Sequence, residues 1–152
     1  MDVLQRIAYI MHGMPGTGKS PLAKELAGAR GNVFSTSDLF VVDDVYHFDA
    51  RKLGDFHEQN FLNFCAALDR RVQVVVCDNT NSMPFEWSRY ETAARVRRYK
   101  VVHIWMPIID PEKASKGTHN VPIESCKRIG DRLQFHMKNH NVQPNSHLFI
   151  KP

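Results

Sequence analysis

Short apolar runs alternate along the chain with stretches whose apolar residues recur at helical spacing. The runs predict strands, because buried strands are typically apolar segments bounded by turn residues. These strands are expected over residues 6–11, 32–35, 72–77 and 99–106. The helical spacing predicts helices over residues 20–29, 55–70, 84–95 and 123–139, and a short helical segment from residue 110. Strands that alternate with helices predict one three-layer α/β domain over residues 1–152, with a parallel sheet at its centre.

Composition and charge narrow the class of protein. Of the 152 residues, 43% are hydrophobic and 24% are charged, which is ordinary globular composition and excludes a disordered or fibrous chain. The net charge of +4 favours anionic ligands such as nucleotides or nucleic acid. We see no secretory signal and no apolar run long enough to cross a bilayer, so we expect an intracellular protein, cytoplasmic or nuclear, without a membrane partner. The three isolated cysteines are expected to be small core residues in a reducing compartment.

A glycine-rich segment joins the first predicted strand to the first predicted helix. Its eight residues fit the phosphate-loop pattern G-x-x-x-x-G-K-[ST]: Gly13, Met14, Pro15, Gly16, Thr17, Gly18, Lys19 and Ser20. Glycines let successive backbone N–H groups turn inward around phosphate oxygens, and the helix start adds its positive dipole end. Lys19 is expected to contact the outer phosphates in catalysis, and the Ser20 hydroxyl to bind magnesium. The segment predicts ATP or another nucleoside triphosphate as ligand, with Mg²⁺ as cofactor.

A second candidate residue follows the apolar run 74–77. Asp78 has the position of a strand-end carboxylate beside a phosphate loop, where it would hold magnesium or its waters. The alternative is a residue that closes the strand in an Asx turn, because Asp78 opens an Asp-Asn-Thr-Asn sequence. The phosphate loop favours the metal role, since the magnesium of a triphosphate needs a hard oxygen ligand nearby.

Four segments occur in an order typical of one kinase family: residues 13–20, 35–38, 77–81 and 117–122. In these segments the chain resembles the polynucleotide-kinase-like P-loop kinases. That family includes the phage-type 5′-hydroxyl polynucleotide kinases and small animal kinase-like domains of ubiquitin-ligase-binding proteins. The resemblance implies the P-loop nucleoside triphosphate hydrolase fold of the adenylate-kinase type, with a helical lid over residues 110–122. It also implies transfer of the γ-phosphoryl group of ATP to a polynucleotide 5′-hydroxyl.

Three positions depart from the family pattern. Ser37 stands where the family has its general base, so either the neighbouring Asp38 takes that role from a shifted loop or the base is missing. The lid arginines are replaced in residues 114–117, which leaves Lys116 to neutralise the charge that develops on the phosphoryl group. Lysine lacks the bidentate fork of arginine, so weaker stabilisation is expected. Phe40 stands at the position of the arginine that grips the substrate's phosphate in the phage enzymes.

Three functions therefore compete. The first is an ATP- and Mg²⁺-dependent kinase whose acceptor, and partner, is the 5′ end of a single-stranded nucleic acid. The second is a nucleotide-binding module with weakened catalysis, which Ser37 and the missing lid arginines favour. The third is a kinase of a small nucleoside or metabolite, because so short a chain has little surface for a long polymer. The sequence does not indicate an oligomeric state.

Other residues are secondary candidates. Asp43 and Asp44 are expected to form a solvated acidic loop. His136 and His140 have i, i+4 spacing, which we interpret as a surface pair near a helix end in preference to a metal site. Phe40 or Tyr46 could stack a base, and the apolar residues 148–150 could either dock or fray.

Overall fold

A computed structural model describes residues 4–117, 119–140, 142 and 149–151 of the protein. Its strands are β1 (Ile7–His12), β2 (Gly31–Phe34), β3 (Val41–Val42), β4 (Val45–Tyr46), β5 (Val74–Cys77), β6 (Lys100–Trp105) and β7 (Phe149–Lys151). Its α-helices are α1 (Lys19–Ala27), α2 (Leu53–Asp69), α3 (Pro84–Val96), α4 (Pro111–Ser115) and α5 (Ile123–Asn139). Short 3₁₀ turns cover Gly28–Arg30, Thr36–Phe40 and Ala50–Lys52. None of the helices in these ranges combines the length and apolar character needed to cross a membrane.

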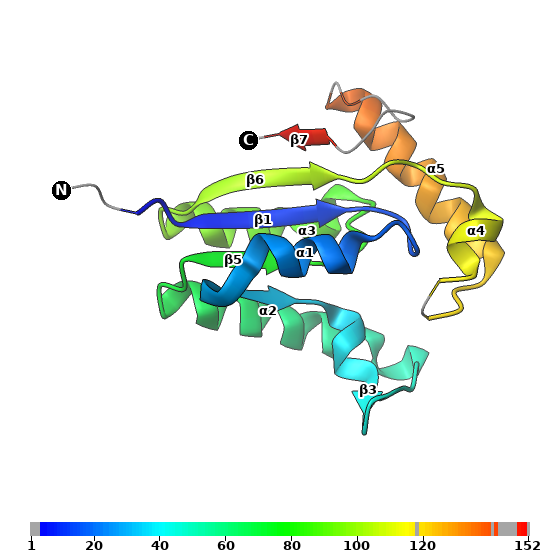
Figure 1. Ribbon diagram of the computed structural model, residues 1–152, viewed down its shortest axis with the longest axis horizontal. Coiled ribbons are helices and arrows are strands. Elements are labelled where there is room, and N and C mark those ends of the chain that lie inside the picture. The colour runs from blue at the N-terminus through cyan, green and yellow to red at the C-terminus, as the bar shows by residue number, and fades with distance from the viewer. Residues whose placement is uncertain (1–3, 118, 141, 143–148, 152) are drawn as a thin grey trace.

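The main sheet has the strand order β2-β5-β1-β6-β7. Strands β2, β5, β1 and β6 pair in parallel, as the alternation of strands and helices predicts, and β7 adds an antiparallel edge beside β6. Helix α1 covers one face of the sheet, and α2 and α3 cover the opposite face (Figure 1). The three-layer α/β fold is therefore confirmed.

Side chains that alternate along the buried strands supply the two cores. In β1, Ala8 and Ile10 pack with Phe64 of α2 and Tyr90 of α3, and all four are at most 1% exposed. Met11, the residue after Ile10, packs on the other face with Ala23 and Ala27 of α1. This double burial explains why the strands are continuous apolar runs, because a parallel sheet that is covered on both faces has no solvent side.

A third apolar cluster fixes the lid end of the molecule. Met14 of the phosphate loop packs with Ala114 of α4 and with Cys126, Leu133 and Met137 of α5. These α5 positions recur at helical spacing, which is why the sequence predicted the range 123–139 that the helix occupies. The cluster packs the segment that was predicted as a lid, residues 110–122, against the phosphate loop.

The structure adds two elements to those predicted. Strands β3 and β4 form a hairpin whose turn residues, Asp43 and Asp44, have left-handed φ values of 50° and 65° and are exposed. The acidic loop is therefore a tight turn. Residues 149–151 dock as β7, whereas residue 148 of the predicted apolar patch lies outside the described residues. Of the cysteines, Cys77 and Cys126 are buried and Cys65 is half-buried.

Candidate functional site

The phosphate loop connects the end of β1 to the start of α1 at the carboxyl edge of the sheet. Gly16 and Gly18 have left-handed φ values of 76° and 82°, a conformation that glycine adopts without a steric penalty. The Thr17 hydroxyl donates to the Met14 carbonyl at 2.9 Å and braces the turn. These contacts form the loop that the pattern predicts, with the amide groups of the α1 start beside it.

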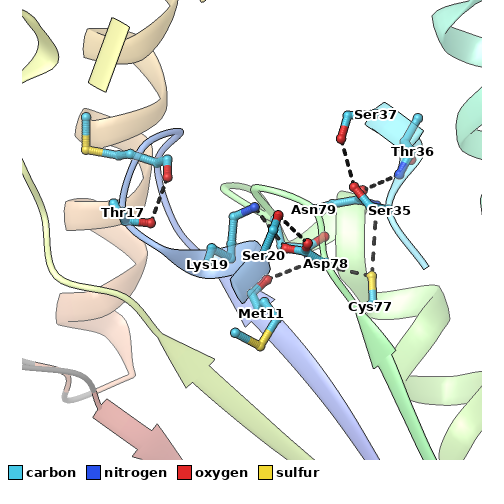
Figure 2. Close-up of polar contacts among 12 residues, drawn as sticks. Met11, Thr17, Lys19, Ser20, Ser35, Thr36, Ser37, Cys77, Asp78 and Asn79 are labelled. Carbon is cyan, nitrogen blue, oxygen red and sulfur yellow. Dashed lines mark hydrogen bonds and ion pairs between the residues drawn. The ribbon is translucent and has the colours of Figure 1, made fainter. Parts of the chain in front are cut away.

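Asp78 draws together the two side chains that open α1. The Lys19 ammonium donates to Asp78 Oδ1 at 3.0 Å, and the Ser20 hydroxyl donates to Oδ2 at 2.7 Å. Figure 2 shows both side chains converging on this carboxylate from α1. Asp78 is 1% exposed and Lys19 is 12% exposed, so the ion pair is shielded from water. These contacts favour the predicted role at the phosphate loop over that of a residue that only closes the strand.

The oxygens of Ser20 and Asp78 suit a hard cation. Both are ligands that Mg²⁺ accepts, and they already lie within 2.7 Å of each other beside the phosphate loop. Magnesium in nucleotide sites typically takes one or two protein oxygens, with phosphate oxygens and waters filling its octahedron. The residues present therefore fit a phosphate-bound Mg²⁺.

Asp38 lies in the 3₁₀ turn that follows β2, at the same sheet edge. The turn is fixed by the Asp38 N–H, which donates to the Ser35 carbonyl at 3.1 Å, and by the Thr36 N–H, which donates to Asn79 Oδ1 at 3.0 Å. The Ser37 hydroxyl is engaged with the Ser35 hydroxyl at 2.9 Å (Figure 2). Ser37 is thus tied to its own turn, whereas Asp38 is exposed at the site.

The Asp38 carboxyl interacts electrostatically with both members of the Lys19–Asp78 ion pair. Partial desolvation raises the pKa of the Asp38 carboxyl, and the negative charge of Asp78 raises it further, against the attraction of Lys24, His119 and Lys19. A raised pKa makes a carboxylate a stronger base near neutral pH. The direction of this shift is the one that a general base requires.

The lid segment touches the phosphate loop through two glycines. A Cβ added at Gly117 would lie 3.2 Å from Gly16 Cα and from the Ala114 carbonyl oxygen, so the two backbones approach as closely as glycine permits. The neighbouring Lys116 is exposed. Because Gly117 packs against Gly16, its neighbour Lys116, the predicted lid cation, lies beside the phosphate loop.

The hairpin reaches the lid from the other side. The Tyr46 ring lies 4.0 Å from the His119 ring, and Phe40 packs at 4.6 Å from Phe56. Phe40 is 3% exposed, so the expectation that it could stack a base is wrong: its ring is part of the core below the hairpin.

His140 lies near Trp105, with 5.8 Å between ring centroids, and is half-buried, so the pair with His136 is not simply a surface feature.

A buried histidine chain that the sequence analysis missed lies beneath the phosphate loop. His12, directly before Gly13, donates through Nδ1 to the Asn81 carbonyl at 2.9 Å, and its Nε2 contacts His103 Nδ1 at 2.8 Å. The Nε2 atom of His103 contacts Glu91 at 2.9 Å. A histidine at the end of an apolar strand was the available signal, but its partners come from β6 and α3.

Hydrogen bonding assigns the protons in this chain. Because a carbonyl only accepts, His12 carries its proton on Nδ1 and accepts from His103 at Nε2. Burial and the neighbouring His103 lower the pKa of His12 well below its ordinary value. Burial alone would raise the pKa of Glu91, but hydrogen bonds from His103 and Arg95 outweigh it and lower the value. Glu91 is therefore ionised and is held by His103 and Arg95.

Comparisons with known proteins agree with this fold. Residues 9–118 match the AAA domain family, so the chain belongs to that family. The chain is 30% identical over 134 residues to the human (Homo sapiens) NEDD4-binding protein 2, in an alignment that covers 84% of this chain and 8% of that protein.

Solved structures share the fold at lower identity. A chain in the structure of the Pnkp1/Rnl/Hen1 RNA repair complex superposes with a TM-score of 0.63 at 14% identity, covering 99% of this chain and 50% of that one. APE1195 superposes with a TM-score of 0.53 at 16% identity, covering 97% of this chain and 84% of that one. The protein therefore has the α/β fold of P-loop kinase-like proteins and spans only part of the first relatives that it matches.

Proposed function

We propose that the protein is an ATP- and Mg²⁺-dependent kinase that transfers the γ-phosphoryl group to a hydroxyl acceptor, with a polynucleotide 5′-hydroxyl as the leading acceptor. The observation that carries this proposal is the convergence of Lys19 and Ser20 on buried Asp78, with the Asp38 carboxyl in electrostatic reach of the same group. A phosphate-binding loop, two oxygen ligands and a carboxylate base at one sheet edge are the groups that phosphoryl transfer needs.

The donor is held by the phosphate loop. The backbone N–H groups of residues 16–20 surround the β- and γ-phosphates, and Lys19 leaves Asp78 to contact the outer phosphate oxygens. Ser20 and Asp78 would hold Mg²⁺, which would supply positive charge beside the phosphates. Asp78 would then pair with Mg²⁺ and Lys19 with phosphate, so neither of the two buried charges would be left without a partner.

The chemical step assigns Asp38 as general base. The acceptor hydroxyl oxygen forms a bond to the γ-phosphorus while the bond from that phosphorus to the bridging oxygen of ADP breaks. The hydroxyl proton passes to the Asp38 carboxylate, and ADP leaves with the electron pair of the broken bond. Lys116, beside the loop through Gly117, offsets the negative charge that develops on the transferred group.

Two observations support a polynucleotide acceptor. The net charge of +4 favours a polyanion, and the RNA repair complex that contains Pnkp1 includes a chain of the same fold. The salt dependence of the acceptor KM tests this choice against a small acceptor. A polynucleotide releases counterions on binding, so its KM rises steeply with salt, whereas the KM of a free nucleoside does not respond in this way.

The second candidate is a nucleotide-binding module with weakened catalysis. The Ser37 hydroxyl, at the position of the family's base, is bound to Ser35 and offers no carboxylate. Such a module would bind Mg²⁺–ATP through the phosphate loop but would not transfer the phosphoryl group. ATP binding measured beside transfer separates the two functions.

An Asp38→Asn variant tests the assigned chemistry, with Asp43→Asn as the matched control because Asp43 lies in the exposed hairpin turn. General-base catalysis contributes about 10²–10⁴-fold, so we expect kcat for transfer to fall by about that factor in Asp38→Asn with ATP binding unchanged. We expect the control to keep the wild-type rate. Equal rates in both variants would remove Asp38 from the mechanism.

A further inference from the structure

A hollow of about 480 Å³ opens beside the phosphoryl-transfer site and is unassigned in the mechanism above. Its lining begins at Asn79, the residue after Asp78, and continues with His57 of α2, Phe85 and Arg89 of α3, and Arg132 of α5. The hollow is therefore bounded by three helices and by the strand end that carries the buried carboxylate. Its volume lies within the range of small-molecule sites, about 300–1,000 Å³, and suits one nucleotide unit.

Arg132 provides an unengaged positive charge in this lining. Among the described residues it forms no hydrogen bond or ion pair, and its side chain is exposed. The other arginine, Arg89, donates to Glu58 at 2.6 Å and to the His57 carbonyl at 3.2 Å, so its charge is already balanced. An arginine without a partner, in a concave site, suits a phosphate group.

The acidic group of the lining does not compete for this cation. Glu86 accepts hydrogen bonds from the Ser82 hydroxyl at 2.8 Å and from the Met83 N–H at 3.0 Å, which caps the start of α3. Its carboxylate is thus committed to the helix terminus. Because Glu58 balances Arg89 and the Glu86 carboxylate is bound at the helix start, Arg132 is the cation of the lining that remains for a ligand.

Phe85 supplies an aromatic face next to these polar groups. It lies in the first turn of α3 and is 73% exposed, in contrast to Phe40 and Phe64, which are at most 3% exposed. An exposed phenylalanine at the mouth of a cationic hollow suits the face of a nucleobase, which stacks on aromatic rings regardless of base identity. Since Phe40 is locked in the core, Phe85 is the better placed ring for this role.

We propose that this hollow binds the acceptor nucleotide, with its base stacked on Phe85 and its phosphate bound by Arg132. The inference rests on the proposed kinase function and specifies its acceptor: a nucleotide with a free 5′-hydroxyl and a phosphate on its 3′ side. In this proposal the 5′-hydroxyl points toward Asn79, the lining residue that adjoins Asp78 in the chain. The acceptor is either a free nucleoside 3′-monophosphate or the terminal unit of a strand.

The experiment compares Arg132→Ala with Arg128→Ala, an exposed arginine of the same helix that contacts only Ser125 among the described residues. Phosphoryl transfer is measured with three acceptors: adenosine, adenosine 3′-monophosphate and a 5′-hydroxyl oligonucleotide. We expect Arg132→Ala to raise the KM of both phosphate-bearing acceptors by about tenfold or more and to leave the KM of adenosine and of ATP unchanged. Arg128→Ala should leave all four constants at the wild-type values.

Phe85 is tested in the same way against Phe135, an exposed phenylalanine of α5 outside the lining. Phe85→Ala should raise the KM of all three acceptors by about tenfold, since each has a base to stack, and Phe85→Trp should restore it. Phe135→Ala should have no effect. If the KM values of the acceptors are the same in Phe85→Ala and Phe135→Ala, Phe85 does not stack the base.

A binding measurement keeps the inference independent of turnover. Calorimetric titration of adenosine 3′-monophosphate into protein saturated with a non-hydrolysable ATP analogue should show binding that weakens about tenfold in Arg132→Ala and not in Arg128→Ala. Binding of this kind without transfer would refute the kinase function and keep the nucleotide site. Absence of binding, or equal binding in both variants, would overturn the site, whereas transfer to adenosine would then still support the kinase. The acceptor with the lower KM, adenosine 3′-monophosphate or the oligonucleotide, shows whether a free nucleotide or the end of a strand is preferred.

Discussion

The ion pair between Lys19 and Asp78 holds the ligand-free site together, and a double-mutant cycle measures its strength. The variants are Lys19→Met, Asp78→Asn and the double substitution. At 3.0 Å and an effective dielectric constant of about 20, the Coulomb attraction is about 5.5 kcal/mol. Desolvation of both groups offsets part of this energy, so we expect each single variant to lower the free energy of unfolding by about 3 kcal/mol. The double variant should lose about 2 kcal/mol less than the sum of the two, because neither buried charge is then left alone.

Urea denaturation followed by tryptophan fluorescence at pH 7 supplies the four free energies of unfolding. Lys24→Met, an exposed lysine of the same helix, is the control and should change the free energy by less than about 0.5 kcal/mol. Single-variant losses that add within about 0.5 kcal/mol would refute the coupling. A second series with Mg²⁺–ATP at about 100 times its Kd should stabilise the wild type by about 2.7 kcal/mol, and each single variant much less.

Three further predictions concern the base, the loop and the buried histidines. With Asp38 as the proposed base, Ser37→Asp should change kcat by less than about tenfold, and a rise of about 100-fold or more in steady-state transfer assays would contradict that assignment. Gly16→Ala should lower the free energy of unfolding by about 1–2 kcal/mol and weaken ATP binding, because φ is +76° at this position. The control Gly54→Ala, whose added Cβ meets open space, should cause neither loss, and calorimetry measures both quantities. The depressed pKa of His12 means that the unfolded chain takes up a proton near pH 6.5 while the folded protein does not. Stability should therefore fall as the pH drops below about 6.5, by up to about 1.4 kcal/mol per pH unit, and His12→Asn should flatten the slope of ΔG against pH where His47→Asn does not.

Local patterns account for the parts of the fold that were predicted. The range 123–139 was predicted as a helix because one face carries its apolar residues, and β5 and β6 because they are buried on both faces. The hairpin was not predicted, because its strands are two residues long and its turn places two aspartates at left-handed φ values, where glycine or asparagine is the usual signal. The edge strand β7 depends on pairing with β6, which no local pattern specifies.

The candidate site also has a part that local sequence patterns predict and a part that they do not. Lys19, Ser20 and Asp78 were predicted because a loop pattern and a strand end determine their positions, and the structure brings the three together. The hollow was not predicted, because Phe85 and Arg132 come from two helices 47 residues apart and become neighbours only through tertiary packing. An exposed phenylalanine or arginine has no sequence signature of its own.

The most direct test of the proposed function is transfer of labelled γ-phosphate from ATP to a short 5′-hydroxyl oligonucleotide, with Lys19→Ala as the control. We predict Mg²⁺-dependent label on the 5′ end with the wild-type protein and none with the variant, because the proposed mechanism requires Lys19 to contact the transferred group. Absence of label with the wild type, under conditions in which it binds ATP, would contradict a polynucleotide kinase. Label that persists in Lys19→Ala would contradict the site.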